Sequence, residues 1–120
     1  MIRAISELLG KPNQFKRVGA NTTVETNKNG AVSVELHGNQ IASVFWSASG
    51  QCHCFSIYAN GYLWHSRTTF SRINALARHL LGTSVLYSNK GEKWLSRKVG
   101  DRVWDTIDQY SWSINQWQRI

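Results

Sequence analysis

Cysteine, proline and acidic residues are all scarce in this chain of 120 residues, and each scarcity excludes something. Only two cysteines occur, and Cys52 and Cys54 are separated by one residue, a spacing at which a disulfide would close a strained ring. A chain without a disulfide framework is typical of a reducing compartment, so we expect the cytoplasm. No apolar run approaches the length of a membrane span and the N-terminus lacks a signal-peptide core, so we expect no membrane association.

The shortage of acids leaves the chain strongly basic. Seven Asp and Glu face fourteen Lys and Arg, which gives a formal charge of +7. The excess is uneven, because residues 1–100 carry twelve cations and four acids whereas residues 101–120 carry two cations and three acids. A basic body favours a polyanionic partner such as nucleic acid, which gains affinity by counterion release. The alternative is a basic domain that has no such partner.

The apolar content is sufficient for a folded core. Hydrophobic residues make up 42% of the chain, and six tryptophans are among them. A chain of this length buries roughly two-thirds of its unfolded surface, so we expect a single domain over residues 1–120. Tryptophan suits either a compact core or a binding face, and the sequence leaves both open.

The hydrophobic spacing predicts an α+β fold. Helical spacing predicts a short N-terminal helix and a main helix that Thr68 or Thr69 caps and Gly82 ends. Period-two alternation and turn residues predict strands at residues 22–26, 31–37, 41–47, 52–58 and 62–64, and a further hairpin at 85–95. Residues 103–117 fit helical spacing, although Tyr110, Trp112 and Ile114 also alternate as in a strand; we favour the helix. The predicted architecture is an antiparallel sheet of five to seven strands, in a meander of hairpins, with one main helix packed on it and short helical termini.

About half of the chain resembles a small domain of bacteriophage and prophage proteins. The similar segments are His37-Gly38-Asn39-Gln40-Ile41-Ala42, the stretch from Thr68 through Arg72-Ile73-Asn74 to Leu76, and the hairpin from Val85 to Leu95. The family has no settled activity, so the resemblance implies phage or prophage origin, and hence a host cytoplasm, but little chemistry. From the residues themselves, Asn74 borders the apolar stripe of the helix and can hydrogen-bond a neighbouring strand or loop.

No catalytic or metal centre is predicted. In a strand, Cys52 and Cys54 point to one face and His53 to the other, so the three cannot share a tetrahedral metal ion. His65 and Ser66 are adjacent, which rarely places a base and a nucleophile in reach of each other. Three aspartates, Asp101, Asp105 and Asp108, are interpreted as a solvated polar face. We therefore expect neither an enzyme nor a cofactor.

A basic cluster after residue 66 is the most informative feature. It contains seven cations and a neighbouring tryptophan, Arg67, Arg72, Arg78, Lys90, Lys93, Trp94, Arg97 and Lys98, with Glu92 as the only acid in that stretch. Cations beside an exposed aromatic suit a sugar-phosphate backbone with a stacked base. The first functional hypothesis is therefore nucleic-acid binding through these residues, and its alternative is a solvated basic surface with Trp94 in the core.

An aromatic-rich C-terminal end supports a different hypothesis. Its aromatic residues, Trp104, Tyr110, Trp112 and Trp117, exceed what one terminal segment needs for docking on its own domain. Surplus aromatics anchor protein partners or homodimers. The alternative function is therefore a phage-encoded inhibitor, of the anti-defence type, that binds a host protein. A third hypothesis is a small-molecule or nucleotide sensor in the concave face of the sheet.

Overall fold

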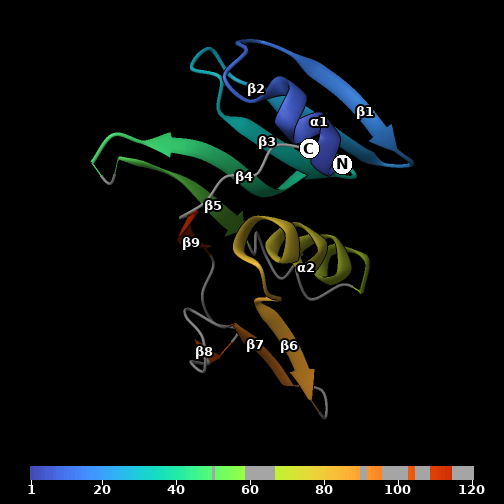
Figure 1. Ribbon diagram of the computed structural model, residues 1–120. Coiled ribbons are helices and arrows are strands. Elements are labelled where there is room, and N and C mark those ends of the chain that lie inside the picture. The colour runs from blue at the N-terminus through green and yellow to red at the C-terminus, as the bar shows by residue number, and fades with distance from the viewer. Residues whose placement is uncertain (50, 59–66, 90–91, 96–102, 105–108, 115–120) are drawn as a thin grey trace.

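The computed structural model describes residues 1–49, 51–58, 67–89, 92–95, 103–104 and 109–114 (Figure 1). In these ranges there are two helices, α1 (Ile2–Leu8) and α2 (Arg67–Leu81). The strands are β1 (Phe15–Gly19), β2 (Thr22–Thr26), β3 (Val32–Leu36), β4 (Asn39–Ser47), β5 (Cys52–Tyr58), β6 (Leu86–Asn89), β7 (Glu92–Leu95), β8 (Val103–Trp104) and β9 (Gln109–Ile114). The predicted α+β class is confirmed.

Two antiparallel sheets organise the strands. Six strands form the larger sheet in the order β1-β2-β3-β4-β5-β9, so the first five follow one another as a meander. The prediction of one sheet of five to seven strands holds only in part, because the larger sheet has six strands but the hairpin predicted at residues 85–95 belongs to a second sheet. Strands β6, β7 and β8 form a separate three-stranded sheet, which lies on the far side of α2 from β1–β3 (Figure 1).

One face of the six-stranded sheet carries the core. Along β2 and β3, Val24 and Val34 are buried and pair in register, whereas the residues between them along each strand are only half-buried. Ala42 and Ile57, which are also buried, continue the same row across β4 and β5. The helices contribute residues such as Ile5 and Ile73 to this single apolar cluster. Both helices therefore pack on this inner face, and the opposite face is called the outer face below.

Gly30 fixes the approach of the β2–β3 turn to the end of α1. Its carbonyl accepts a hydrogen bond of 2.9 Å from the backbone N–H of Gly10. A Cβ on Gly30 would lie 2.6 Å from the Cα of Gly10, and the residue has φ of +80°. Only glycine fits both the close approach and the left-handed backbone.

Asn74 attaches the second sheet to α2. Its side-chain oxygen accepts hydrogen bonds from the backbone N–H groups of Val85 and Leu86, each of 2.9 Å. Its amide nitrogen donates to the carbonyl of Leu86 at 2.8 Å. The side chain is 7% exposed, so these bonds satisfy polar groups that water does not reach. The predicted hydrogen bond from Asn74 to a neighbouring strand is confirmed.

Several finer predictions are wrong. Within the segment predicted as a C-terminal helix, residues 109–114 instead form β9, which pairs with β5 along its whole length. Neither Thr68 nor Thr69 caps α2, since Arg67 is already helical. The prediction that Gly82 ends the helix is confirmed, since Gly82 has φ of +84° and its N–H donates a hydrogen bond to the carbonyl of Arg78. Strand β1 was not predicted, and the strand expected at residues 62–64 lies outside the described residues.

Candidate functional site

The exposed side of α2 presents two arginines on one line. Arg67 and Arg78 are both exposed, and their separation of eleven positions corresponds to about three turns, or about 16 Å along the axis. Ser71 is exposed between them, and His79 beside Arg78 is exposed as well. The helix therefore carries positive charge at both ends of its solvent-facing side.

Arg72, the third arginine of α2, is placed differently. It is half-buried rather than exposed, and its Nε is enclosed without a hydrogen-bond partner among the described residues. It is five positions from Arg67 and six from Arg78, so it is turned by roughly 120–140° around the helix from the line that they form. Of the three helix arginines in the predicted cluster, two form a common exposed line.

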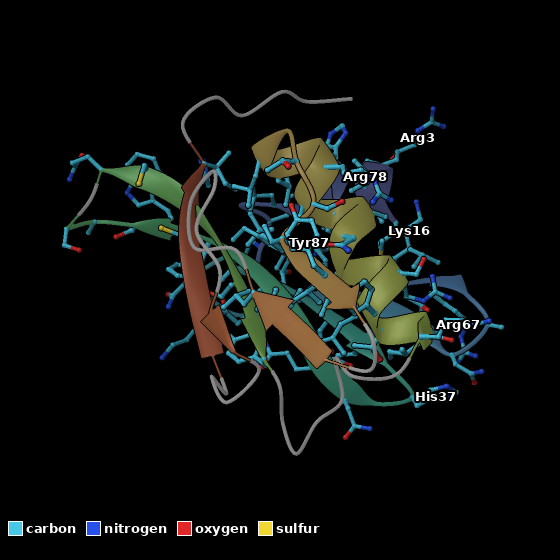
Figure 2. The ribbon with its side chains drawn as sticks, turned by 90° about the horizontal axis from the view of Figure 1, so that it is seen from below. Arg3, Lys16, His37, Arg67, Arg78 and Tyr87 are labelled. Carbon is cyan, nitrogen blue, oxygen red and sulfur yellow. The ribbon has the colours of Figure 1, made fainter. Side chains whose placement is uncertain are left out.

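Other basic side chains extend this line into a surface. Figure 2 shows the labelled side chains of Arg3, Lys16, His37, Arg67 and Arg78 along the same side of the molecule as α2. They come from α1, β1, the β3–β4 turn and α2, and all five are exposed. We call these five residues the basic surface. The basic surface is therefore formed by residues that are far apart in the sequence.

One acid lies on the side of the basic surface. Glu7 of α1 accepts a hydrogen bond of 2.9 Å from the Nζ of Lys16, and the two form an ion pair. This hydrogen bond, together with the charge of Lys16, lowers the pKa of Glu7 from its ordinary value. Nearby Arg3 and Lys11 lower this pKa further. A carboxylate here is held charged by surrounding cations.

The other two acids with described side chains lie on the outer face. Glu25 and Glu35 alternate with the buried valines of β2 and β3, and the hydroxyl of Thr23 donates to Glu35 at 3.2 Å. Burial, and then the hydrogen bond and charge of Glu25, raise the pKa of Glu35. Negative charge on this face is therefore poorly compensated, in contrast to the side that carries α1 and α2.

A groove adjoins these two acids. Its volume is about 1210 Å³, and its lining includes Glu25, Glu35, Ser43 and Tyr58. The hydroxyls of Ser43 and Tyr58 are hydrogen-bonded to each other at 3.0 Å. The third hypothesis from the sequence, a sensor of small molecules, would use a hollow of this kind.

The remaining members of the predicted basic cluster are only partly described. Lys90, Arg97 and Lys98 lie outside the described residues. Lys93 and Trp94 are on β7, where Trp94 pairs in register with Tyr87 of β6 and Trp104 of β8. The sequence did not single out Tyr87, which is 36% exposed and lies near Arg78 (Figure 2). Its position opposite Trp94 in the predicted hairpin was the signal that could have found it.

The aromatic residues of the C-terminal end lie mostly on strands. Tyr110 pairs with Ile57 and Trp112 with Phe55 in the backbone register of β9 and β5. Trp104 is on β8, and Trp117 is outside the described residues. The binding of a partner by these four aromatics stays a prediction.

Two further exposed aromatics, besides Tyr87, were missed by the sequence reasoning. Trp46 near the end of β4 is 54% exposed, and Phe15 at the start of β1 is 61% exposed. Trp46 packs edge-to-face on His53, with ring centroids 5.1 Å apart. Apolar and polar residues alternate only weakly around these two positions, so the sequence pattern did not indicate that the aromatics are exposed.

The Cys-His-Cys segment lies on β5. Cys52 and Cys54 form no disulfide with each other, and both are half-buried. His53 pairs with Trp46 in the register, one position out of step with the two cysteines. Among the side chains that the structure describes, no three His, Cys, Asp or Glu residues lie close enough together to hold a metal ion.

The fold is that of a small α+β protein, with exposed basic side chains along α2 and with Glu25 and Glu35 on the outer face of the larger sheet. The chain belongs to the Kyanoviridae Gp96 protein family, which it matches over residues 1–117. This is a phage protein family of unknown function, so the phage origin implied by the resemblance is confirmed. No curated protein and no solved structure matches the chain. No helix within the described ranges is long and apolar enough to span a membrane.

Proposed function

We propose that this phage protein binds nucleic acid through the basic surface, without catalysing a reaction, in the cytoplasm of its host. One observation carries the proposal. Arg67 and Arg78 share an exposed line on α2 and are joined there by Arg3, while Glu25 and Glu35 lie on the opposite face of the sheet. Separation of charge in this way directs a polyanion to one side of the protein.

Binding of this kind is directed at the phosphate backbone. Guanidinium groups hold phosphate oxygens with paired N–H donors, and they do so without reading sequence. The ion pair with Glu7 partly neutralises Lys16, so the arginines of α1 and α2 provide most of the attraction. The expected ligand preference is therefore broad in sequence and strongly dependent on salt.

The test is a salt titration of oligonucleotide binding by fluorescence anisotropy. In the double variant Arg67→Gln/Arg78→Gln, we expect the slope of log K against log salt to become shallower by about 1.5 to 2, because two phosphate contacts are lost. Arg17→Gln is the matched control. Arg17 is exposed but pairs with Thr23, so its side chain is on the outer face and the slope should not change. Equal slopes for the wild-type protein and the double variant would refute the proposal.

Capture of a host protein is a second candidate, of the inhibitor type considered from the sequence. The exposure of Trp46 and Phe15 favours it, since large exposed aromatics are typical anchors at protein interfaces. Host lysate treated with nuclease separates the two functions. Bands that survive the nuclease and disappear with Trp46→Ala support an inhibitor, whereas bands that the nuclease removes support nucleic-acid binding.

A further inference from the structure

Tyr87 presents an aromatic ring beside the basic surface. It lies on β6 next to the end of α2 that carries Arg78 (Figure 2), and 36% of it is exposed. Its hydroxyl donates a hydrogen bond of 2.8 Å to the backbone carbonyl of Ser84. This hydrogen bond holds the polar end of the side chain and so fixes the orientation of the ring.

Arg78 is tied to the same residue. Its Nη1 donates a hydrogen bond of 3.0 Å to the hydroxyl of Ser84. An arginine has five N–H donors, so this bond leaves most of them for another acceptor. Ser84 therefore holds a guanidinium and an aromatic ring next to each other, one through its side chain and the other through its backbone.

The backbone around this pair is rigidly attached to α2. Asn74 bonds the N–H groups of Val85 and Leu86 and the carbonyl of Leu86, all within three residues of Tyr87. Arg78 itself is one turn along α2 from Asn74. Ring and cation are consequently fixed to the same helix, and little conformational entropy remains to be lost when a ligand binds them.

We propose that Tyr87 stacks on an unpaired base while Arg78 holds an adjacent phosphate, so that the ligand of the basic surface is single-stranded nucleic acid. The inference rests on the proposed function and makes it more specific. Stacking on an aromatic side chain needs an exposed base face, which single strands offer and an intact duplex does not. Stacking also tolerates any base, in agreement with contacts directed at the backbone.

The experiment compares Tyr87→Ala with Tyr87→Phe on an oligothymidylate and on a hairpin duplex of matched charge. Stacking contributes roughly 1–3 kcal/mol per base, so Tyr87→Ala should weaken single-strand binding by about 5- to 150-fold. The slope with salt should not change, because no phosphate contact is lost. Tyr87→Phe keeps the ring and should bind within about threefold of the wild-type protein.

The outcomes separate this inference from the proposed function. If Tyr87→Ala binds the single strand as tightly as the wild-type protein, or if the duplex binds as tightly as the single strand, the inference is overturned. The proposed function would still stand if Arg67→Gln/Arg78→Gln reduced the slope with salt. Since Tyr87 is exposed, circular dichroism of both variants should match that of the wild-type protein, which shows that a loss of affinity is not a loss of fold.

Discussion

The two faces of the sheet differ in polarity along β2 and β3, where successive residues point to opposite sides. On the inner face, Val24 and Val34 are buried under the helices, and on the outer face Glu25 and Glu35 follow directly in the same strands. One pair of strands thus supplies part of the core and part of a polar surface. The difference shows that the side of the sheet, rather than the position along the chain, decides the chemistry available to a ligand.

Two carboxyl groups report the electrostatic difference between these sides. Cations around Glu7, Lys16 above all, lower its pKa, whereas burial and the neighbouring Glu25 raise the pKa of Glu35. An anion is therefore stabilised beside α1 and destabilised on the outer face. A negatively charged ligand should for the same reason choose the helix-bearing side.

The largest expected loss of stability comes from a substitution on the helix-bearing side of the sheet. Asn74→Ala removes three hydrogen bonds and leaves backbone groups of Val85 and Leu86 buried without partners. Each unsatisfied group costs about 1–3 kcal/mol, so we expect a loss of at least about 3 kcal/mol in the free energy of unfolding. Urea denaturation measures it. Ser71→Ala, on the exposed side of the same helix, should change the free energy by less than about 0.5 kcal/mol.

The next effect loosens the contact between α1 and the sheet. Gly30→Ala combines a strained backbone with a clash against Gly10, and should cost more than about 2 kcal/mol. Gly38→Ala is the matched control. Gly38 has a similar φ of +79° but open space around its Cα, so only the strain of about 1–2 kcal/mol should remain. Equal losses in thermal denaturation would show that the close approach to Gly10 is unimportant.

A smaller effect on stability, which depends on pH, is expected from Glu35 on the outer face. Because the pKa of Glu35 is raised above 4.5 in the folded protein, the folded state binds this proton more tightly than the unfolded state. Its contribution to stability is therefore lost as the pH rises from about 4.5 through the raised pKa. Glu35→Gln has no such loss, so it should gain stability relative to the wild-type protein between pH 4.5 and 7. A gain of up to about 1 kcal/mol is expected in urea denaturation at pH 7.

The smallest effect is expected at Glu7, the acid on the helix-bearing side. Lys16→Met removes the hydrogen bond that lowers the pKa of Glu7, and an exposed pair of this kind contributes little to stability. Stability from this pair is present above pH 4.5 and is lost as the pH falls through the lowered pKa. An NMR titration should show the pKa of Glu7 rising towards its ordinary value in the variant. An unchanged pKa would assign the shift to Arg3 and Lys11 instead.

Strong alternation made much of the sheet predictable. Strands β2 and β3 were found because their two faces differ in polarity at every step, and α2 was found from the stripe that includes Ile73 and Leu80. Strand β1 escaped because almost all of its residues are exposed, and an exposed edge strand needs no apolar face. Its lysine and arginine add to the positive charge of the chain but do not indicate a strand.

Information from distant parts of the chain decided the rest. The spacing of Tyr110 and Ile114 fits a helix, yet the edge of β5 provides backbone partners for a strand there, and this long-range pairing outweighs the local pattern. The same holds for the basic surface. Arg67 and Arg78 could be read from one helix, but only the fold brings Arg3 to their side of the molecule.

The amide of Asn74 has a consequence for how the protein opens. The N–H groups of Val85 and Leu86 are protected by a side chain of α2 rather than by a neighbouring strand. Their exchange with deuterated solvent should therefore be governed by fraying of α2, and it should keep pace with the helix even if the β6–β7 hairpin parts first. These two amides would act as reporters for the integrity of a helix to which they do not belong.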